Sequence, residues 1–342
     1  MQYKQLGNSE LKVSQIALGT WGLGGGSVWS DKDSTAAEAS RLLDACKEQG
    51  INYVDTAPVY GTGVSEELLG LALQMDGLRK DFVLQTKCSL NWRGEGGNFH
   101  YERDGYTVNN DTSKAAVKKD VEDSLRRLKT DYIDSVIVHY VCKSWPVEET
   151  VEGLEELRKE GKIRTYGLSN SQPKDLEDYQ AAGEKYKAEG GSGTSVVQEF
   201  FSLLSPFHGR DYFPVCSKYG TTFQVYGVLE EGYLTGPGFL EKEFKKTDIR
   251  ARIPWTAEDK KAGLLRYFEA VKPLCEKYSC SYAQLALAWA LAQYDNMSLL
   301  VGCRSRVTLA DSINAVDLRL DPADITFMEE TVKDIQEEVL DK

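Results

Sequence analysis

The sequence predicts a single α/β domain, a (β/α)8 TIM barrel with an N-terminal β-hairpin and extra C-terminal helices. Three observations lead to this fold class. Eight short apolar strands alternate with helical segments, several of the strands end in polar or ionisable residues, and no linker divides the 342 residues. Such alternation requires parallel strands joined by right-handed crossovers, and eight of these units close into a barrel. We therefore expect one domain over residues 1–342.

A doubly wound sheet is the alternative architecture. It would need a glycine-rich turn after the first strand and an acidic residue about twenty positions further on. The run Gly24-Gly25-Gly26 follows the first barrel strand, but it lacks GxGxxG spacing and no helix begins at its end. We expect this run to form a flexible loop at the mouth of the barrel.

Composition and charge disfavour several classes of protein. The 41% hydrophobic and 27% charged residues are ordinary for a soluble globular protein. No apolar run reaches the roughly 18 residues of a membrane span, and the polar N-terminus is unlike a signal peptide, so we expect a cytoplasmic protein. The net charge of −12 disfavours a nucleic-acid partner. The seven scattered cysteines lack metal-site spacing, which indicates reduced structural thiols and no metal.

Turn residues and hydrophobic periodicity predict the elements in order. A Gly7-Asn8-Ser9 turn predicts a hairpin over residues 3–13, and apolar runs predict the barrel strands. The strands centre near residues 16, 53, 84, 136, 166, 197, 224 and 300. Amphipathic patterns predict the helices, the second of which begins at the capping residue Ser65. The helices cover residues 34–49, 65–73, 113–128, 147–160, 173–189, 282–293 and 323–340.

Residues 89–111 are a long segment without periodicity and with several aromatic side chains. Loops of this length inside a compact domain are often functional. We expect the segment to form the wall or lid of a pocket. A surface insertion without a function is the alternative.

The chemistry of the predicted barrel lies at the ends of its strands. Asp55, Lys87 and His139 end three strands, and Tyr60 follows the first of these in a loop. The C-terminal strand ends form one rim in this fold, so the side chains are expected to converge. A tyrosine with an unperturbed pKa near 10 donates a proton slowly unless a nearby cation stabilises its phenolate. Lys87 can supply that cation, Asp55 can hold the ammonium in place, and His139 can orient a carbonyl oxygen.

This set of residues suits a carbonyl that becomes an alkoxide as hydride arrives. Hydride must come from a cofactor, because no amino-acid side chain supplies it. Ser169, Asn170 and Gln198 follow or end other strands and can hydrogen-bond both ends of a carboxamide. Tyr226 offers a flat face on which a nicotinamide ring can stack. The sequence therefore predicts a nicotinamide-dependent oxidoreductase.

Longer motifs extend this interpretation over nearly the whole chain. They are Leu18-Gly19-Thr20-Trp21, Asp55-Thr56-Ala57, Tyr60-Gly61, Thr86-Lys87, Asp131-Tyr132-Ile133-Asp134, Gly161-Lys162-Ile163-Arg164 and Gly167-Leu168-Ser169-Asn170. With these motifs the chain resembles the aldo-keto reductase superfamily, in particular its bacterial branch of methylglyoxal-reductase-like and inositol-dehydrogenase-like members. The resemblance implies a catalytic tetrad of Asp55, Tyr60 as general acid/base, Lys87 and His139. It also implies NAD(P)H bound across the C-terminal rim without a Rossmann domain.

The resemblance further implies cofactor contacts along the rim. They are Thr20, Trp21, Asp55, Ser169, Asn170, Gln198, Tyr226, Gly227, Leu229, Gly302, Arg304, Ser305, Thr308, Asp311 and Ser312. Some positions depart from the family's pattern. Tyr226-Gly227-Val228-Leu229 stands where relatives have Tyr-Ser-Pro-Leu, Glu230-Glu231 where a basic residue is common, and Glu199 where a neutral one is. Arg304 fits a 2′-phosphate as a charge-assisted fork, which favours NADP(H) over NAD(H), and Asp311 is a candidate adenine contact.

Trp21, Trp92 and Tyr140 are expected to line the substrate pocket. The expected substrate is a small aldehyde, ketone or sugar carbonyl, or a polyol in the reverse direction. The alternative is a nicotinamide-redox-sensing regulatory subunit that acts on a protein partner, like the potassium-channel β subunits. An intact tetrad is compatible with both functions, and turnover of NADPH with simple aldehydes distinguishes them.

Overall fold

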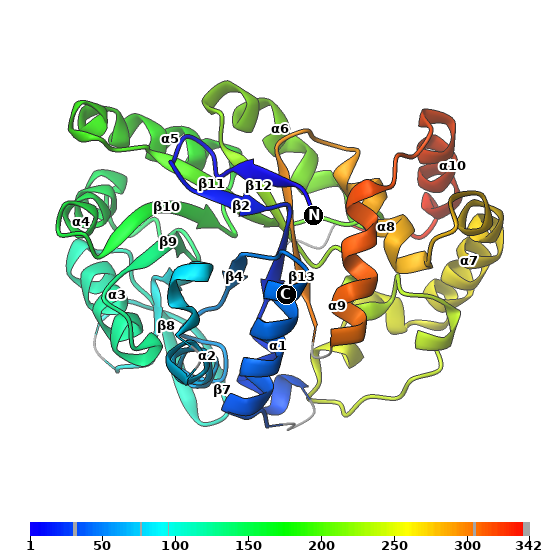
Figure 1. Ribbon diagram of the computed structural model, residues 1–342, viewed down its shortest axis with the longest axis horizontal. Helices are drawn as coiled ribbons and strands as arrows, with labels where there is room; N and C mark the ends of the chain where they lie inside the picture. The colour runs from blue at the N-terminus through cyan, green and yellow to red at the C-terminus, as the bar shows by residue number, and fades with distance from the viewer. Residues whose placement is uncertain (30–32, 76, 95, 304–305, 338–342) are drawn as a thin grey trace.

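The computed structural model describes residues 1–29, 33–75, 77–94, 96–303 and 306–337. Among these residues, eight parallel strands close into a barrel in the order β10-β11-β12-β13-β3-β4-β5-β9 (Figure 1). The predicted fold class is thereby confirmed. The strands are β3 (Ile16–Gly19), β4 (Tyr53–Asp55), β5 (Val83–Cys88), β9 (Ile133–Val138), β10 (Ile163–Ser169), β11 (Thr194–Phe200), β12 (Thr222–Tyr226) and β13 (Met297–Gly302).

Helices surround the barrel, as Figure 1 shows, and most follow the predicted ranges. They are α1 (Ala36–Glu48), α2 (Val64–Met75), α3 (Lys114–Leu128), α4 (Val147–Lys159), α5 (Pro173–Gly183), α6 (Phe207–Tyr219), α7 (Glu258–Tyr278), α8 (Tyr282–Leu291), α9 (Arg306–Ile313) and α10 (Pro322–Val332). The sequence did not predict α6, α7 and α9. The extra C-terminal helices are confirmed, with α7 and α10 side by side at the right of Figure 1.

Several helix boundaries differ from prediction, and three of them change how a helix ends or is capped. The helix predicted over 173–189 ends at Gly183, and a 3-10 helix over Glu184–Glu189 continues it. The last helix, predicted over 323–340, ends at Val332, and the backbone N–H of Glu337 donates to Leu204 O at 3.0 Å. The second helix begins at Val64, so Ser65 lies within it and does not cap it.

The N-terminal hairpin is confirmed as β1 (Tyr3–Gln5) paired antiparallel with β2 (Lys12–Ser14). Leu6, Leu11 and Val13 from the hairpin belong to one buried apolar cluster with side chains of the barrel strands. The barrel side chains are Ala17, Tyr53, Val83, Ile137, Val196 and Leu300. The hairpin contacts the starts of the strands, where the Gly7 N–H donates to Thr222 Oγ1 at 2.8 Å. It therefore covers the end of the barrel opposite the rim.

The segment 89–111 differs most from expectation. In its described part, which omits residue 95, strands β6 (Leu90–Asn91), β7 (Asn98–Arg103) and β8 (Tyr106–Asn110) form an antiparallel sheet at the lower left of Figure 1. Asp104 and Gly105 join β7 to β8 with φ angles of 51° and 81°, the left-handed pair of a tight hairpin turn. The side chains of β7 are all exposed or half-buried, so neither face of this strand is part of the core.

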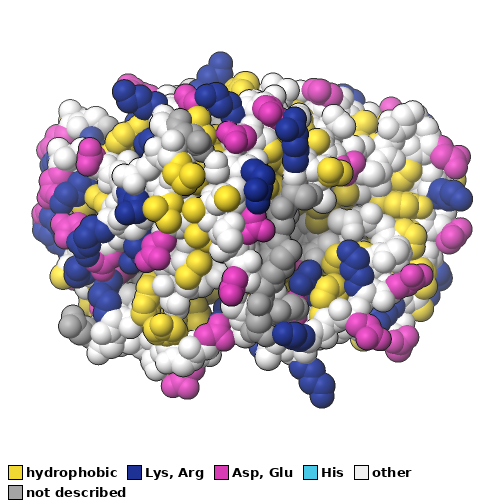
Figure 2. All heavy atoms as spheres, turned by 60° about the horizontal axis from the view of Figure 1, so that its bottom comes forward, with side chains coloured by type: hydrophobic (Ala, Val, Ile, Leu, Met, Phe, Trp, Pro, Cys, Tyr) yellow, Lys and Arg dark blue, Asp and Glu magenta, His cyan; other side chains and the backbone are white. Residues whose placement is uncertain are grey.

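The face of the protein drawn in Figure 2 carries side chains of mixed character. In Figure 2 acidic and basic side chains are mixed, with apolar ones between them. No helix in the described ranges is long and apolar enough to cross a bilayer. The same residues contain no group of three or more His, Cys, Asp or Glu side chains that could hold a metal ion.

Candidate active site

A buried ion pair lies at the centre of the site. Asp55 ends β4 and Lys87 lies near the end of β5, and their side chains are 0% and 1% exposed. Lys87 Nζ donates to both Asp55 carboxylate oxygens, at 2.6 and 2.8 Å, and to the Thr56 carbonyl at 2.9 Å. Burial lowers the pKa of Lys87, and the charge of Asp55 opposes that shift. A buried pair of this kind persists only because both charges are well hydrogen-bonded.

Glutamines from other strands complete the environment of Asp55. Gln85 Nε2 and Gln198 Nε2 donate to Asp55 Oδ1 at 2.7 and 3.0 Å, and both also donate to Gln224 Oε1 at 2.7 Å. The Tyr53 hydroxyl donates to Gln85 Oε1. These residues form a polar layer inside the barrel. Sequence reasoning missed Tyr53, Gln85 and Gln224, although glutamines within otherwise apolar strands were a signal of inward-facing polar groups.

The Tyr60 hydroxyl lies next to this ion pair. Lys87 Nζ lies 3.3 Å from it and 4.9 Å from the ring centroid. The loop that carries Tyr60 crosses the loop after β3 closely, because a Cβ on Gly24 would lie 2.6 Å from the Tyr60 carbonyl carbon. Burial, and then the charge of Asp55, raise the pKa of Tyr60 well above its usual value of 10. Tyr60 is therefore protonated at neutral pH.

His139 follows β9 and completes the group predicted from the strand ends. Its ring lies edge-on to Tyr60 with the centroids 6.2 Å apart. Burial, and then the charges of Lys87 and His100, lower its pKa well below 6.5, so the imidazole is neutral. Its Nδ1 atom has no hydrogen-bond partner among the described residues. The structure thus brings Asp55, Tyr60, Lys87 and His139 together.

Hydrogen-bonding groups of the next strands lie beside His139. Asn170 has a φ of 49°, and its Nδ2 donates to the His139 carbonyl at 2.9 Å and to Ser169 Oγ at 3.1 Å. The Tyr226 hydroxyl donates to Asn170 Oδ1 at 2.6 Å. The amide of Asn170 is therefore already engaged. In the described part of the chain, the Ser169 hydroxyl proton and Gln198 Oε1 have no partner, so they can bind a polar ligand.

Residues 15–333 match the Aldo/keto reductase family. The chain belongs to this family. It is 32% identical to the NADH-specific methylglyoxal reductase of Escherichia coli (strain K12) over 97% of this chain and 98% of the relative. A probable voltage-gated potassium channel subunit beta of Oryza sativa subsp. japonica is 29% identical over 93% of this chain and 92% of that protein.

A solved glycerol dehydrogenase from Gluconobacter oxydans has the same architecture. Its TM-score is 0.84 at 27% identity, covering 97% of this chain and 95% of that chain. This aldo-keto reductase is accordingly an NAD(P)H-dependent oxidoreductase that acts on carbonyl or alcohol groups.

Two acidic departures from the family's pattern have structural explanations. Glu230 is fully buried and accepts hydrogen bonds from the Ser202 hydroxyl and, at 2.7 Å, from Trp255 Nε1. Glu199 accepts from the backbone N–H and the hydroxyl of Ser171, at 3.0 and 2.8 Å. Neither carboxylate contacts Asp55 or Tyr60, and both instead fasten loops of this aldo-keto reductase at its rim.

Gly227 is required by a close approach. Its φ is 70°, and a Cβ at this position would collide with the ring of Phe200. The ring of Phe200 lies 5.6 Å from that of Tyr226 in an edge-on arrangement. A serine at this position would displace this ring pair.

The residues predicted to contact the distal part of the cofactor lie in different surroundings. Arg304 and Ser305 lie outside the described residues. The Asp311 carboxylate accepts from Ser281 Oγ at 3.0 Å and from Gln284 Nε2 at 2.9 Å, at the start of α8. The Ser312 hydroxyl donates to the Thr308 carbonyl within α9 at 3.0 Å. Gly302 is exposed at the end of β13, and Leu229 is half-buried.

Thr20 is buried and joins the backbone segments that support the site. Its hydroxyl donates to the Asp55 carbonyl at 2.8 Å and lies 2.9 Å from Ser65 Oγ. Ser65 Oγ also lies 2.9 Å from Thr56 Oγ1. These hydroxyls link the end of β3, the end of β4 and the first turn of α2.

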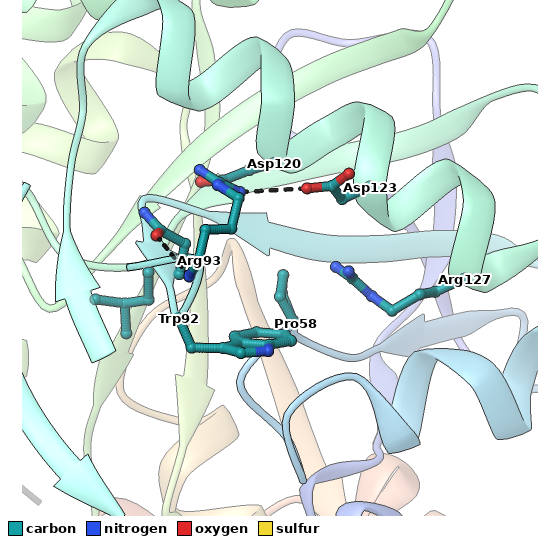
Figure 3. A pocket seen from close by; sticks show the side chains of 8 residues that line it. Pro58, Trp92, Arg93, Asp120, Asp123 and Arg127 are labelled. Atoms are coloured by element: carbon teal, nitrogen blue, oxygen red, sulfur yellow. Dashed lines mark hydrogen bonds and ion pairs between the residues drawn. The ribbon is translucent and has the colours of Figure 1, made fainter. Parts of the chain in front are cut away.

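The three residues predicted to line the substrate pocket do not lie together. Trp21 stacks on Tyr60 with ring centroids 6.0 Å apart, and Tyr140 lies 5.4 Å from His139. Trp92 lines a different pocket of about 240 Å³, shown in Figure 3, where the Arg127 guanidinium lies 5.5 Å from its ring. The other residues around this pocket are Pro58, Leu90, Asn91, Arg93, Asp120 and Asp123.

Sequence reasoning did not single out His100 and Tyr101. The His100 ring lies 4.4 Å from that of Tyr140, and Tyr101 lies 5.3 Å from His100. The Asp104-Gly105 pair was the signal that could have predicted the hairpin that carries them. Nothing in the sequence indicated that this hairpin reaches His139.

Proposed function

We propose that this enzyme reduces a small aldehyde, ketone or sugar carbonyl with NAD(P)H, or oxidises the corresponding alcohol, with Tyr60 as general acid/base. The observation that carries the proposal is the position of the Lys87 ammonium. It contacts the Asp55 carboxylate at 2.6 Å and the Tyr60 hydroxyl at 3.3 Å. An ammonium at that distance stabilises the phenolate that remains after proton donation. The same contact lets the phenolate accept a proton in the reverse reaction.

The nicotinamide cofactor supplies or accepts the hydride when it is bound. In the reduction, Tyr60 donates its proton to the carbonyl oxygen as that oxygen gains negative charge, and solvent later reprotonates the phenolate. His139 is neutral, so it can hydrogen-bond the same oxygen without protonating it first. Such proton donation contributes a rate factor on the order of 10² to 10⁴.

We infer that Ser169 and Gln198 hold the carboxamide of the cofactor and that Tyr226 lies against its ring. The unused Ser169 proton and Gln198 oxygen support this assignment, since a carboxamide offers both an acceptor and a donor. Arg304 favours NADPH, because a guanidinium fork matches a phosphate. The similarity to an NADH-specific relative favours NADH instead. We therefore propose NADPH as the preferred cofactor and NADH as the alternative.

The decisive experiment replaces Tyr60 by Phe. The variant should lose about 10² or more in kcat for carbonyl reduction while it binds cofactor as the wild type does, because only proton donation is removed. Tyr132→Phe, which removes a phenol from the opposite end of β9, is the matched control and should keep its activity. Turnover of Tyr60→Phe at the wild-type rate would remove Tyr60 from its role.

Two further measurements separate the alternatives. Arg304→Ala should weaken NADPH binding more than NADH binding in a fluorescence titration, and an equal loss would show that Arg304 does not bind the 2′-phosphate. Wild-type protein that binds cofactor tightly but turns over no aldehyde, ketone, sugar or polyol would favour the redox-sensing alternative.

A further inference from the structure

The β7–β8 hairpin spans the mouth of the barrel. Asn98 Nδ2 donates to Ser144 Oγ at 2.7 Å and contacts Cys142 Sγ at 3.2 Å, both in the loop after β9. At the other end, a Cβ on Gly26 would lie 3.0 Å from Oδ2 of Asp104, so the tip reaches the loop after β3. In the barrel β3 and β9 are separated by β4 and β5. The hairpin therefore passes over the strand ends that hold the ion pair.

A β-bulge directs two consecutive side chains of this hairpin. In the pairing with β8, Phe99 is opposite Asn109 and Tyr101 is opposite Val108, so His100 is the additional residue. Adjacent side chains of a regular strand point to opposite faces, and a bulge removes that alternation. His100 and Tyr101 consequently lie with their rings 5.3 Å apart, while Phe99 is 68% exposed.

His100 connects the hairpin to the catalytic group through neighbouring rings. Its ring is 4.4 Å from Tyr140, which is 5.4 Å from His139, which is 6.2 Å from Tyr60. The proximity is also electrostatic, because His100 helps to lower the pKa of His139 and Tyr101 helps to raise that of Tyr60. The hairpin residues are thus part of the surroundings of the reacting carbonyl.

The two sides of this mouth differ in polarity. Trp21 stacks on Tyr60 and presents an aromatic face. His100, Tyr101 and Tyr140 on the side of the hairpin carry ring N–H and hydroxyl groups, which donate and accept hydrogen bonds. A substrate whose carbonyl oxygen lies at Tyr60 and His139 would extend its next carbon toward one of these sides. A second oxygen on that carbon would suit the polar side.

We propose that His100 and Tyr101 are specificity-determining residues that hydrogen-bond an oxygen on the carbon next to the reacting carbonyl, so that the enzyme prefers α-dicarbonyl and α-hydroxycarbonyl substrates. This inference rests on the proposed function and names its substrate class. Sites that hydrogen-bond a substrate oxygen discriminate strongly against an analogue that lacks it, because their polar groups are then left unpaired.

The test compares two substrates of three carbons, methylglyoxal and propanal, which differ by the second oxygen. His100→Leu and Tyr101→Phe should each lower kcat/KM for methylglyoxal about tenfold, as expected for one lost hydrogen bond, and change that for propanal less than about twofold. Each variant is compared with wild type on the same substrate, so intrinsic reactivity cancels. Tyr106→Phe is the matched control, because it removes an exposed phenol from the same hairpin and should change neither value.

Each outcome has a distinct meaning. Retained propanal turnover shows that a variant is folded, and Tyr101→Phe removes only one oxygen atom should His100→Leu fold poorly. Equal losses on both substrates, or no loss on methylglyoxal, would overturn the inference while leaving the proposed function intact. Wild-type enzyme that turned over neither compound, nor any other carbonyl, would overturn the proposed function and the inference with it.

Discussion

Replacing Asp55 by Asn tests whether the buried ion pair stabilises the barrel. The substitution keeps the shape of the side chain but leaves the Lys87 ammonium, 1% exposed, without its counter-charge. Breaking a buried pair by removing one partner costs about 3–5 kcal/mol. At about 2 °C per kcal/mol for a large domain, the melting temperature should fall by about 6–10 °C. Carbonyl reduction should also fall, because Lys87 would then lose its proton more easily.

Thermal unfolding followed by circular dichroism measures this change. Asp81→Asn is the matched control, because it breaks the Lys47–Asp81 pair, whose side chains are 56% and 43% exposed. Surface pairs are worth about 0–1 kcal/mol, so its melting temperature should fall by less than about 2 °C. Adding Lys87→Met to Asp55→Asn should restore much of the stability without restoring activity. An Asp55→Asn variant as stable as Asp81→Asn would refute the reasoning.

Two further predictions follow from the geometry of the site. In urea unfolding, Gly227→Ala should lower the free energy of unfolding by at least about 1 kcal/mol more than Gly161→Ala does. Both glycines have a positive φ, but only Gly227 faces a ring, that of Phe200. Equal losses in the two variants would contradict the predicted collision. The rate of carbonyl reduction should be flat from about pH 7 to 9, since the raised pKa of Tyr60 keeps the acid protonated and the lowered pKa of His139 keeps it neutral. Initial rates across that range, with protein stability checked at each pH, measure this, and a fall toward pH 9 would show that Tyr60 or Lys87 loses its proton within the range.

The strands and the three residues at their ends could be predicted because both follow from local patterns. Apolar runs that stop at Asp55, Lys87 and His139 define strands, and the barrel topology then brings their ends to one rim. The positions of these side chains needed no knowledge of distant contacts. Their contact with Tyr60 required only that the loop after β4 turn back over the rim.

Other features depend on contacts between distant segments, which local patterns do not contain. Glu230 was taken for a cofactor-site departure, yet Trp255 binds it from 25 residues further along the chain. Trp92 was predicted to line the substrate pocket, and local patterns did not reveal that the Arg127 guanidinium of α3 lies 5.5 Å from its ring. The proposed role of His100 in substrate specificity depends on a β-bulge and on the length of a hairpin. Hydrophobic periodicity in the sequence predicts neither of these features.

The N-terminal hairpin closes one end of the barrel, which leaves the rim as the open end. Leu6, Leu11 and Val13 cover the end opposite the rim, and the Tyr53 ring lies between them and the polar layer. Water and protons that exchange with Lys87 must therefore enter through the rim. A ligand bound there should slow deuterium exchange of the amides in β4 and β5 at their carboxyl ends, while the amides beside the hairpin stay protected in either state.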